Sequence, residues 1–278
     1  MQVFHAPLPG ATRPLFDADL KLALAAALAA ALVSFFLLWL ASLKLRDASI
    51  ADIWWGPGFV VAIAASLAFS PALALPTAIL FGAVIVWALR LGLHIGVRKL
   101  GETHEDPRYA AMRAKAGDAF ARESLTWVFG LQAVLQWIVA WPIIFALASP
   151  MDFEAALFWT GFAVFAAGLG VEAVADWQLA RFRKTRSAPD QVNDRGLWAW
   201  SRHPNYFGET VLWWGLFAMA LALGAPWWTA LSPAVMTFLL LRVSGVTLLE
   251  QGLKKRKPAY AEYARRTSAF VPWPPKRP

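Results

Sequence analysis

The chain has 278 residues, of which 59% are hydrophobic and only 16% are charged, and its formal net charge is +8. Because a soluble globular domain has roughly 45–50% apolar and about 25% charged residues, this composition excludes an ordinary soluble protein. The sequence contains no cysteine, which excludes disulfides, thiolate catalysis and metal sites with cysteine ligands.

Seven segments are apolar enough to cross a membrane as helices, which takes about 20 residues each. In chain order they are residues 20–43, 50–70, 72–97, 126–148, 155–181, 206–223 and 229–250. The first is longer than the apolar core of a cleavable signal peptide, about 7–15 residues, so we expect it to remain as a helix. We therefore predict an all-α integral membrane protein in three parts: an extracytoplasmic segment 1–19, a seven-helix membrane domain 20–250 and an amphipathic tail 251–278.

The basic residues predict how these helices are oriented. The loops after the second, fourth and sixth segments contain no Lys or Arg, whereas the other loops and the tail hold nearly all of them. Cytoplasmic loops carry the excess of Lys and Arg, so we expect the N-terminus outside and the C-terminus in the cytoplasm. Topology and contact with anionic membrane lipids then account for the positive charge, and no nucleic-acid partner is expected.

Ionisable residues within the apolar segments fall in the cytoplasmic half of each helix in this topology. They are Asp52, Arg90, His94, Glu172, Asp176, Glu209, Arg242 and Glu250. Charged groups at this depth are costly and usually pair with each other or contact a ligand. They predict a polar cavity open toward the cytoplasm. Alternatively, Arg90 or Arg242 pairs with Glu172 or Asp176 only to hold helices together.

Residues 196–209, GLWAWSRHPNYFGE, place a polar motif at the start of the sixth segment. Its residues Arg202, His203, Asn205, Tyr206 and Glu209 stand close to the basic residues Arg181, Arg183, Arg186 and Arg195. Guanidinium groups bind phosphates bidentately, whereas an amide and carboxylates suit the amide and ribose hydroxyl groups of a cofactor. The set fits a phosphorylated dinucleotide, and also an adenosine cofactor that carries a carboxylate. The four His residues form no HxxxH or HxxE pair, so no metal is expected.

The motif, the preceding Glu172–Asp176 helix and a tail of the form YxxYxxxTxxFxP that begins at Tyr260 resemble the steroid 5-alpha-reductase C-terminal domain superfamily. The similarity is greatest to a bacterial membrane branch and covers most of residues 45–275. The superfamily includes sterol C14-reductases and isoprenylcysteine carboxyl methyltransferases. The resemblance implies a cytoplasmic-side cavity for NADPH or S-adenosylmethionine, a lipid substrate that enters from the bilayer, and location in a bacterial inner membrane.

The resemblance also implies roles for individual residues. The positions that match the cofactor residues of the reductases are Asn205, Glu209, Asp176, Arg183, Arg98 and one of Tyr260 or Tyr263. They favour NADPH over S-adenosylmethionine. Trp55 and Ile95 stand where steroid 5-alpha-reductases carry the Glu and Tyr that hold the steroid carbonyl. Asp52 and His94 are the nearest substitutes as proton donors, although a helix cap and a packing hydrogen bond are simpler roles for them.

We therefore expect an NADPH-dependent reductase of a C=C bond in a steroid-, isoprenoid- or fatty-acyl-like lipid. The alternative is a lipid methyltransferase that uses S-adenosylmethionine and needs no proton donor. A third possibility is a lipid-binding membrane protein without enzymatic activity. In each case the partners are membrane lipids, and the amphipathic tail is expected to cover the cofactor site.

Overall fold

The computed structural model describes residues 18–71, 73–101, 104–148, 153–188, 190–243 and 259–276. Most of the predicted N-terminal segment, the end of the seventh predicted span with Glu250, and the beginning of the tail lie outside the described residues. The long helices are α1 (Ala18–Leu45), α2 (Ile50–Ser66), α3 (Leu75–Leu100), α6 (Leu131–Ala148), α7 (Ala155–Thr185) and α9 (Pro204–Leu221). The shorter ones are α4 (Pro107–Ala116), α5 (Phe120–Ser124), α8 (Leu197–Trp200), α10 (Leu231–Phe238) and α12 (Ala259–Arg266).

Five short segments complete the secondary structure of the described residues. Three are 3₁₀ turns, namely η1 (Leu67–Phe69), η2 (Gly117–Ala119) and η4 (Trp227–Ala230). Two are π-helical, namely η3 (Leu125–Gly130), which leads into α6, and η5 (Leu239–Val243), which continues α10. In the part of the chain that the structure describes, the only β pairing is an isolated bridge between Ser201 and Ser268. The prediction of an all-α protein is therefore confirmed.

Five helical stretches within the described residues are long and apolar enough to cross a membrane. They are Ala18–Leu45, Ile50–Phe69, Leu75–Leu100, Pro107–Ala148 and Ala155–Thr185. Their outward faces expose large apolar side chains, for example Leu37 (59% exposed) and Leu93 (68% exposed), which is typical of contact with lipid. The chain is therefore a membrane protein. Helices α9 and α10 occupy the positions of the sixth and seventh predicted spans but are not among these five.

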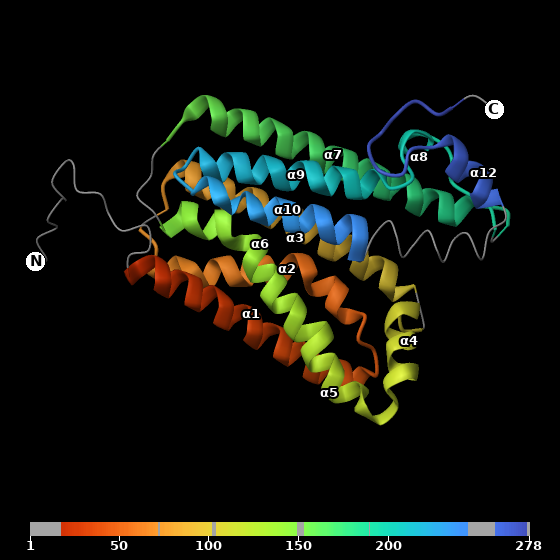
Figure 1. Cartoon of the computed structure of the whole chain (residues 1–278), viewed down its shortest axis with the longest axis horizontal. Coiled ribbons are helices and arrows are strands. Elements are labelled where there is room, and N and C mark those ends of the chain that lie inside the picture. Colours follow the sequence, from red (N-terminus) through yellow and green to blue (C-terminus); the bar gives the residue numbers. More distant parts are fainter. Residues whose placement is uncertain are drawn as a thin grey trace, which may run out of the picture.

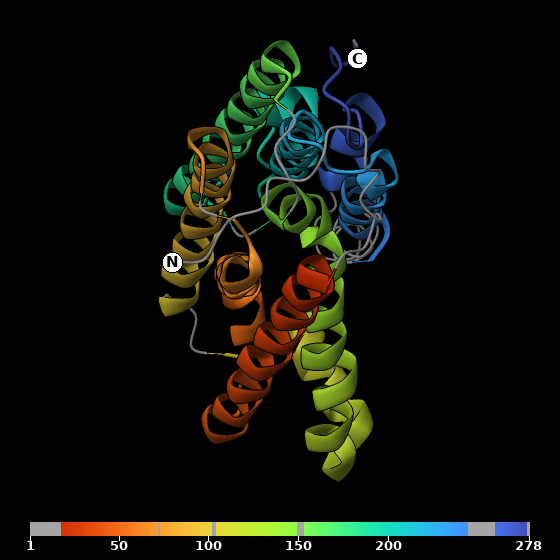
Figure 2. The same ribbon diagram turned by 90° about the vertical axis from the view of Figure 1, so that its left-hand side faces the viewer.

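The helices form an elongated bundle (Figures 1 and 2). Helices α7 and α9 lie side by side on one side of the molecule, and α1 lies on the opposite side against α2 and α6. We call the end of the bundle where α1, α3 and α7 finish and α9 begins the basic end, because the Lys- and Arg-rich loops lie there. Helices α4, α8 and α12 gather at this end (Figure 1).

Glycines allow α7 and α9 to approach backbone to backbone. A Cβ atom on Gly168 of α7 would lie 2.5 Å from the amide nitrogen of Leu212 and 2.7 Å from the carbonyl oxygen of Gly208 on α9. Gly161 and Gly215 make the same kind of contact further along the two helices. Small residues at such an interface permit packing that larger side chains would prevent. The seam holds the α7 carboxylates beside the first turns of α9.

A layer of aromatic rings closes the polar part of the bundle on the side away from the basic end. Phe59, Trp87 and Trp213 are fully buried, and their ring centroids lie 5.0–5.5 Å apart. Trp87 comes one turn before Arg90 on α3, and Trp213 comes one turn after Glu209 on α9. Tilted and edge-to-face packing of this kind is favourable for aromatic rings. Within the described residues, the buried carboxylates Glu172, Asp176 and Glu209 all lie on the side of this layer that faces the basic end.

Helix α4 is fixed to the loop between α1 and α2 by polar contacts. Asp106 caps α4 by accepting a hydrogen bond from the backbone N–H of Arg108, and Pro107 occupies the first helical position. Glu105 accepts 2.8 Å and 2.9 Å hydrogen bonds from Arg113 and a 2.8 Å bond from the backbone N–H of Ala48. The bonds from Arg113 lower the pKa of the Glu105 carboxyl, although partial burial opposes this effect.

The glycine seam predicts opposite effects for two neighbouring substitutions on α7. Gly168→Ala should destabilise the protein by about 1–3 kcal/mol because the new methyl group meets the α9 backbone. Gly170→Ala should be neutral or stabilising by up to about 1 kcal/mol, because this exposed glycine has nothing within 4 Å of a new Cβ and alanine favours helix. Thermal unfolding in detergent measures both effects. Equal effects of the two substitutions would contradict the close packing of α7 against α9 at Gly168.

The lowered pKa of Glu105 predicts a pH-dependent contribution to stability. A carboxylate with a lowered folded-state pKa stabilises the protein fully above its unfolded pKa of about 4.3, and this contribution is lost as the pH falls through the folded-state value. Melting temperatures of the wild type and Glu105→Gln should therefore differ at pH 6 and converge as the pH drops below about 4. A difference that stays constant from pH 7 to pH 3 would rule out this role for the carboxylate.

Candidate functional site

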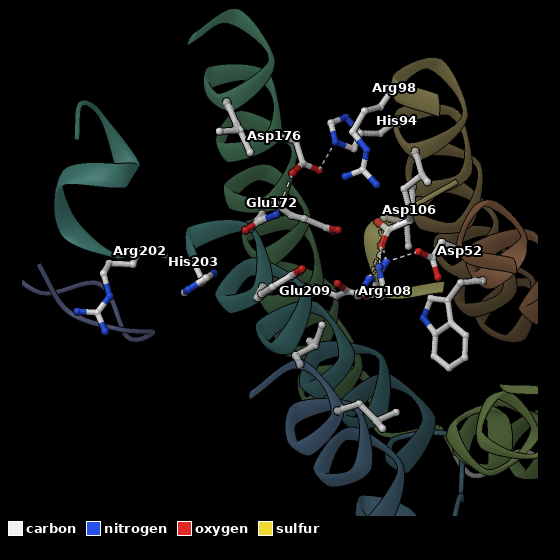
Figure 3. A pocket seen from close by; sticks show the side chains of 18 of the residues that line it. Asp52, His94, Arg98, Asp106, Arg108, Glu172, Asp176, Arg202, His203 and Glu209 are labelled. Carbon is white, nitrogen blue, oxygen red and sulfur yellow. Dashed lines mark hydrogen bonds and ion pairs between the residues drawn. The ribbon is translucent and has the colours of Figure 1, made fainter. Parts of the chain in front are cut away.

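A cavity of about 1060 Å³ lies at the basic end of the bundle (Figure 3). Residues of α2, α3, α4, α6, α7, α9, α10 and α12 line it. Of the site residues predicted from the sequence, those that line it are Asp52, His94, Arg98, Glu172, Asp176, Arg183, Arg202, His203, Asn205, Tyr206, Glu209, Tyr260 and Tyr263. Arg195 is exposed and does not belong to the lining. The cavity thus collects predicted residues that are up to 211 positions apart along the chain.

An ion-pair cluster joins α3 to α7 beside this cavity. Arg90 donates a hydrogen bond from Nη1 to Asp176 Oδ2 at 2.8 Å and another from Nη2 to Glu172 Oε1. Asn205 on α9 donates from Nδ2 to Asp176 Oδ1 at 3.1 Å, and His94 Nε2 lies 3.7 Å from Asp176 Oδ2. Asp176 is therefore the hub of the cluster. The internal ion pair that the sequence allowed as an alternative exists for Arg90, whereas Arg242 is exposed.

Two acceptors of this cluster remain without a hydrogen-bond partner among the described residues. They are Glu172 Oε2 and Asn205 Oδ1, and the Glu172 side chain is only 2% exposed. Buried polar atoms are nearly always hydrogen-bonded in folded proteins. Because both residues line the cavity, its wall contains acceptors that the described residues leave unpaired. Glu209 adds a third buried carboxylate to the same wall.

Asp52 is held by residues of α4. Its Oδ2 accepts a 2.5 Å hydrogen bond from Arg108 Nη2, and its Oδ1 accepts a 2.7 Å bond from the Tyr109 hydroxyl. The carboxylate therefore does not cap its own helix, which was the simpler role considered for it. Sequence reasoning missed Arg108 and Tyr109 because residues 98–125 read as a basic loop. The only signal was the run EDPRY at residues 105–109, whose Asp-Pro pair is typical of a helix start.

His94 lies on α3 one turn beyond Arg90 and one turn before Arg98, and its side chain is 27% exposed. Trp55 and Ile95, the residues that replace the expected Glu and Tyr, also line the cavity. The region around His94 is therefore apolar on one side and acidic on the other. His94 Nε2 lies 3.7 Å from Asp176 Oδ2, and His94 directly precedes Ile95 on α3.

Exposed guanidinium groups line the cavity close to the loops. Arg98 has no hydrogen-bond or ion-pair partner among the described residues, so its charge is available to a ligand. Arg183 and Arg186 come from the last turn of α7 and the residue that follows it. Arg186 and Asn193 were not predicted as site residues. Arg186 belonged to the basic group noted around the motif, whereas Asn193 gave no signal in the sequence.

The tail docks against the segment between α8 and α9. Arg202 donates from Nη1 to the carbonyl oxygens of Ala264 and Thr267, at 2.5 Å and 3.0 Å. The Tyr263 hydroxyl donates to the carbonyl oxygen of Trp198 at 2.6 Å, and Ser201 donates to that of Phe270 at 2.7 Å. These two hydrogen bonds of Arg202 hold the tail, and the residue also lines the cavity. Tyr260 and Tyr263 are buried and form part of the cavity wall.

The remaining wall of the cavity is apolar. Val128, Leu131 and Leu135 come from η3 and α6, and Met236, Leu239 and Leu240 come from α10 and η5. Both π-helical segments contribute to this wall, and π-helical turns inside longer helices frequently occur at functional sites. We call these six residues the apolar wall. Within the described residues, no group of His, Asp and Glu is arranged to hold a metal ion.

Comparison with functionally curated proteins gives no match. A family described as "Protein of unknown function (DUF1295)" matches residues 38–267, which include every helix that contributes to the cavity. The match covers most of the chain, and the protein therefore belongs to the DUF1295 family.

Proposed function

We propose that the protein is a membrane-embedded, NADPH-dependent reductase of a C=C bond in a steroid-, isoprenoid- or fatty-acyl-like lipid. The observation that carries this proposal is the composition of the cavity. One space is lined by exposed arginines, by buried carboxylates and an amide, and by the apolar wall. A large polar cofactor and an apolar substrate would both find matching surfaces there. Its volume of about 1060 Å³ is at the upper end of ordinary ligand pockets, about 300–1,000 Å³.

The residues present fit a phosphorylated dinucleotide. Arg98, Arg183 and Arg186 would hold its phosphate groups, because guanidinium groups bind phosphates with two parallel hydrogen bonds. The unpartnered acceptors Glu172 Oε2 and Asn205 Oδ1 would receive hydrogen bonds from ribose hydroxyl or carboxamide groups. NADPH, when bound, supplies a hydride to the substrate. The protein itself contributes binding, orientation and the exclusion of water.

His94 is the better-placed of the two proposed proton donors. Both carboxyl oxygens of Asp52 already accept hydrogen bonds, from Arg108 and from Tyr109. The His94 side chain is 27% exposed and lines the cavity, and its Nε2 lies 3.7 Å from Asp176 Oδ2. We therefore assign the proton donation to His94 and a positioning role to Asp52.

We infer that the family is related to the steroid 5-alpha-reductase C-terminal domain superfamily. Three residues that the resemblance assigns to the cofactor, Asp176, Asn205 and Glu209, come from α7 and α9 and line one cavity. Trp55 and Ile95 stand at the positions of the substrate-binding Glu and Tyr and line the same cavity. This agreement in location supports the relationship, while the two substitutions imply a substrate other than a 3-oxo-steroid.

The surplus of carboxylates favours a second candidate, a lipid methyltransferase that uses S-adenosylmethionine. Glu172, Asp176 and Glu209 are buried, and Arg90 pairs with two of them while carrying only one positive charge. A cationic sulfonium group would be stabilised beside such a surplus of negative charge. A methyl transfer also requires no proton donor. NADPH remains our first proposal because of the unpaired Arg98 and the neighbouring arginines.

We further infer seven spans, with the N-terminus outside and the C-terminus in the cytoplasm of a bacterial inner membrane. Helix α9 and the α10–η5 segment would supply the sixth and seventh spans, the latter continuing into residues that are not described. The Lys- and Arg-rich loops at one end of the bundle support this orientation by the positive-inside rule. The cavity then opens on the cytoplasmic side, where NADPH is present.

Cofactor identity can be tested with purified protein in detergent. NADPH should bind with micromolar affinity and NADH more weakly, and a ligand at 100 times its Kd stabilises the folded protein by about 2.7 kcal/mol. Thermal shift assays with NADPH, NADP⁺ and S-adenosylhomocysteine measure this. A shift with S-adenosylhomocysteine alone would favour the methyltransferase. No shift with any of the three would indicate a lipid-binding protein without this chemistry.

Substitutions separate the cavity residues from their neighbours. Asn205→Ala and Glu209→Ala should each weaken NADPH binding about tenfold or more, because each removes a hydrogen-bonding group from the cavity wall. Arg195→Ala is the matched control, because Arg195 belongs to the same basic segment but does not line the cavity. Titration of each variant gives the Kd. Equal losses in all three would show that membership of the cavity wall does not determine binding.

The orientation can be tested with reporter fusions in a bacterial host. A C-terminal green fluorescent protein should fluoresce, and a C-terminal alkaline phosphatase should be inactive, because we place the C-terminus in the cytoplasm. Truncated fusions ending at residues 70, 149 and 224 should give active phosphatase, since these loops would lie outside. The reverse pattern would overturn the proposed orientation and place the cavity on the opposite side of the membrane.

A further inference from the structure

A second polar cluster lines the cavity, apart from the α7–α9 wall. Asp52 on α2 binds both Arg108 and Tyr109 on α4, and the Tyr109 hydroxyl accepts a 3.5 Å hydrogen bond from Gln132 on α6. All four residues line the cavity. Three separate helices are thus joined at one point of its surface. Figure 3 shows Asp52, Asp106 and Arg108 close together beside the α7 and α9 carboxylates.

This cluster lies at the end of the apolar wall. Gln132 follows Leu131 directly and comes one turn after Val128, so the amide and the apolar side chains belong to the same stretch of α6 and η3. Trp55 comes one turn after Asp52 on α2 and also lines the cavity. An amphiphile could therefore lie with its hydrocarbon chain along the apolar wall and its polar group at Arg108 and Tyr109.

The charge of Arg108 is already compensated. Arg108 pairs with Asp52 and with Asp106, and these two carboxylates also face a small adjoining space. An anion would meet these carboxylates and a cation would meet Arg108, so the cluster suits a neutral polar group. The hydrogen bonds of Arg108 within the described residues use Nε and Nη2, which leaves Nη1 as a donor on a cavity-lining side chain that is 34% exposed.

The cluster is not needed to attach α4 to the rest of the protein. The Glu105–Arg113 ion pair, the bond from Ala48 to Glu105 and the Asp106 cap already fix that helix. Tyr109 is 6% exposed and lines the cavity, and its hydroxyl is bonded to the polar side chains of Asp52 and Gln132. Because Asp52 retains its ion pair with Arg108, the Tyr109 proton can be donated to a ligand oxygen in place of Asp52.

We propose that Arg108 and Tyr109 bind the carbonyl oxygen of the lipid substrate, with Gln132 and Asp52 as positioning residues. The substrate class is then a neutral lipid with a carbonyl conjugated to the C=C bond, whose chain lies along the apolar wall. The choice of a conjugated carbonyl rests on the proposed reductase function, whereas the binding of a carbonyl at this cluster can be measured without any cofactor.

The test uses the full-length protein in lipid nanodiscs and the probe hexadec-3-en-2-one labelled with ¹³C at the carbonyl carbon. Binding is measured by calorimetry against hexadecane, which has the chain without the oxygen. The carbonyl stretch of the bound probe is measured by isotope-edited infrared difference spectroscopy. We expect the ketone to bind more tightly than hexadecane, and its carbonyl stretch to move to lower frequency as donors polarise the bond.

Tyr109→Phe removes one hydroxyl and keeps the ring, and Arg108→Lys keeps the charge but removes Nη1. Each should weaken ketone binding about tenfold, the effect of one lost hydrogen bond, and move the carbonyl stretch back toward its value in the bilayer. Met112→Leu is the matched control, because Met112 lines the cavity on the same helix without a hydrogen-bond donor. Hexadecane binding should be equal in all four proteins.

The outcomes separate this proposal from the proposed function. If the ketone and hexadecane bind equally, or if Tyr109→Phe and Arg108→Lys leave the carbonyl stretch unchanged, the carbonyl site is wrong even where NADPH binds. If the ketone behaves as expected but NADPH gives no thermal shift, the carbonyl site stands and the reductase proposal fails. Unchanged NADPH affinity in Tyr109→Phe would place the two ligands at separate parts of the cavity.

Discussion

The close approach of α7 and α9 is the constraint on which the rest of the structure depends. Gly168 and Gly208 bring the two backbones together, and the residue that meets Gly208 from α7 is Glu172. The carboxylates of α7 are therefore forced into the neighbourhood of Asn205 and Glu209. If the two helices were further apart, each carboxylate could form a separate hydrogen bond or ion pair. At this spacing they share Arg90, and acceptors are left over for a ligand.

The position of the aromatic layer explains why this polar cluster is tolerated in a membrane protein. Buried charges are costly in an apolar medium unless they are paired or reach water. Trp87 and Trp213 lie directly beyond Arg90 and Glu209, so the charged groups are confined to the side that opens to the basic end. The same confinement creates a boundary between polar and apolar surfaces inside a single cavity, which is the property that a cofactor and a lipid would both require.

The tail and α4 lie far apart in the sequence, and both contribute residues to the cavity wall. The tail is attached in both directions: Ser201 and Arg202 donate to its backbone carbonyl groups, and its own Tyr263 hydroxyl donates to the carbonyl oxygen of Trp198. Helix α4 is attached through charged side chains to the α1–α2 loop and to Asp52. Both elements add tyrosines to the wall, and only those of the tail could be recognised from the motif in the sequence.

The sequence by itself determined the helical membrane character, the basic end and the set of ionisable residues near it, because hydrophobic length and charge placement are properties of local segments. Tertiary structure alone decided which of these residues meet. Arg195 lies two residues before Leu197 of α8 and yet outside the cavity, whereas Tyr109, far from the motif, lines it. Asp52 could be read as a proton donor or a helix cap until α4 was seen to hold it. Pairing across helices depends on their spacing and rotation, and no local pattern in the chain encodes these.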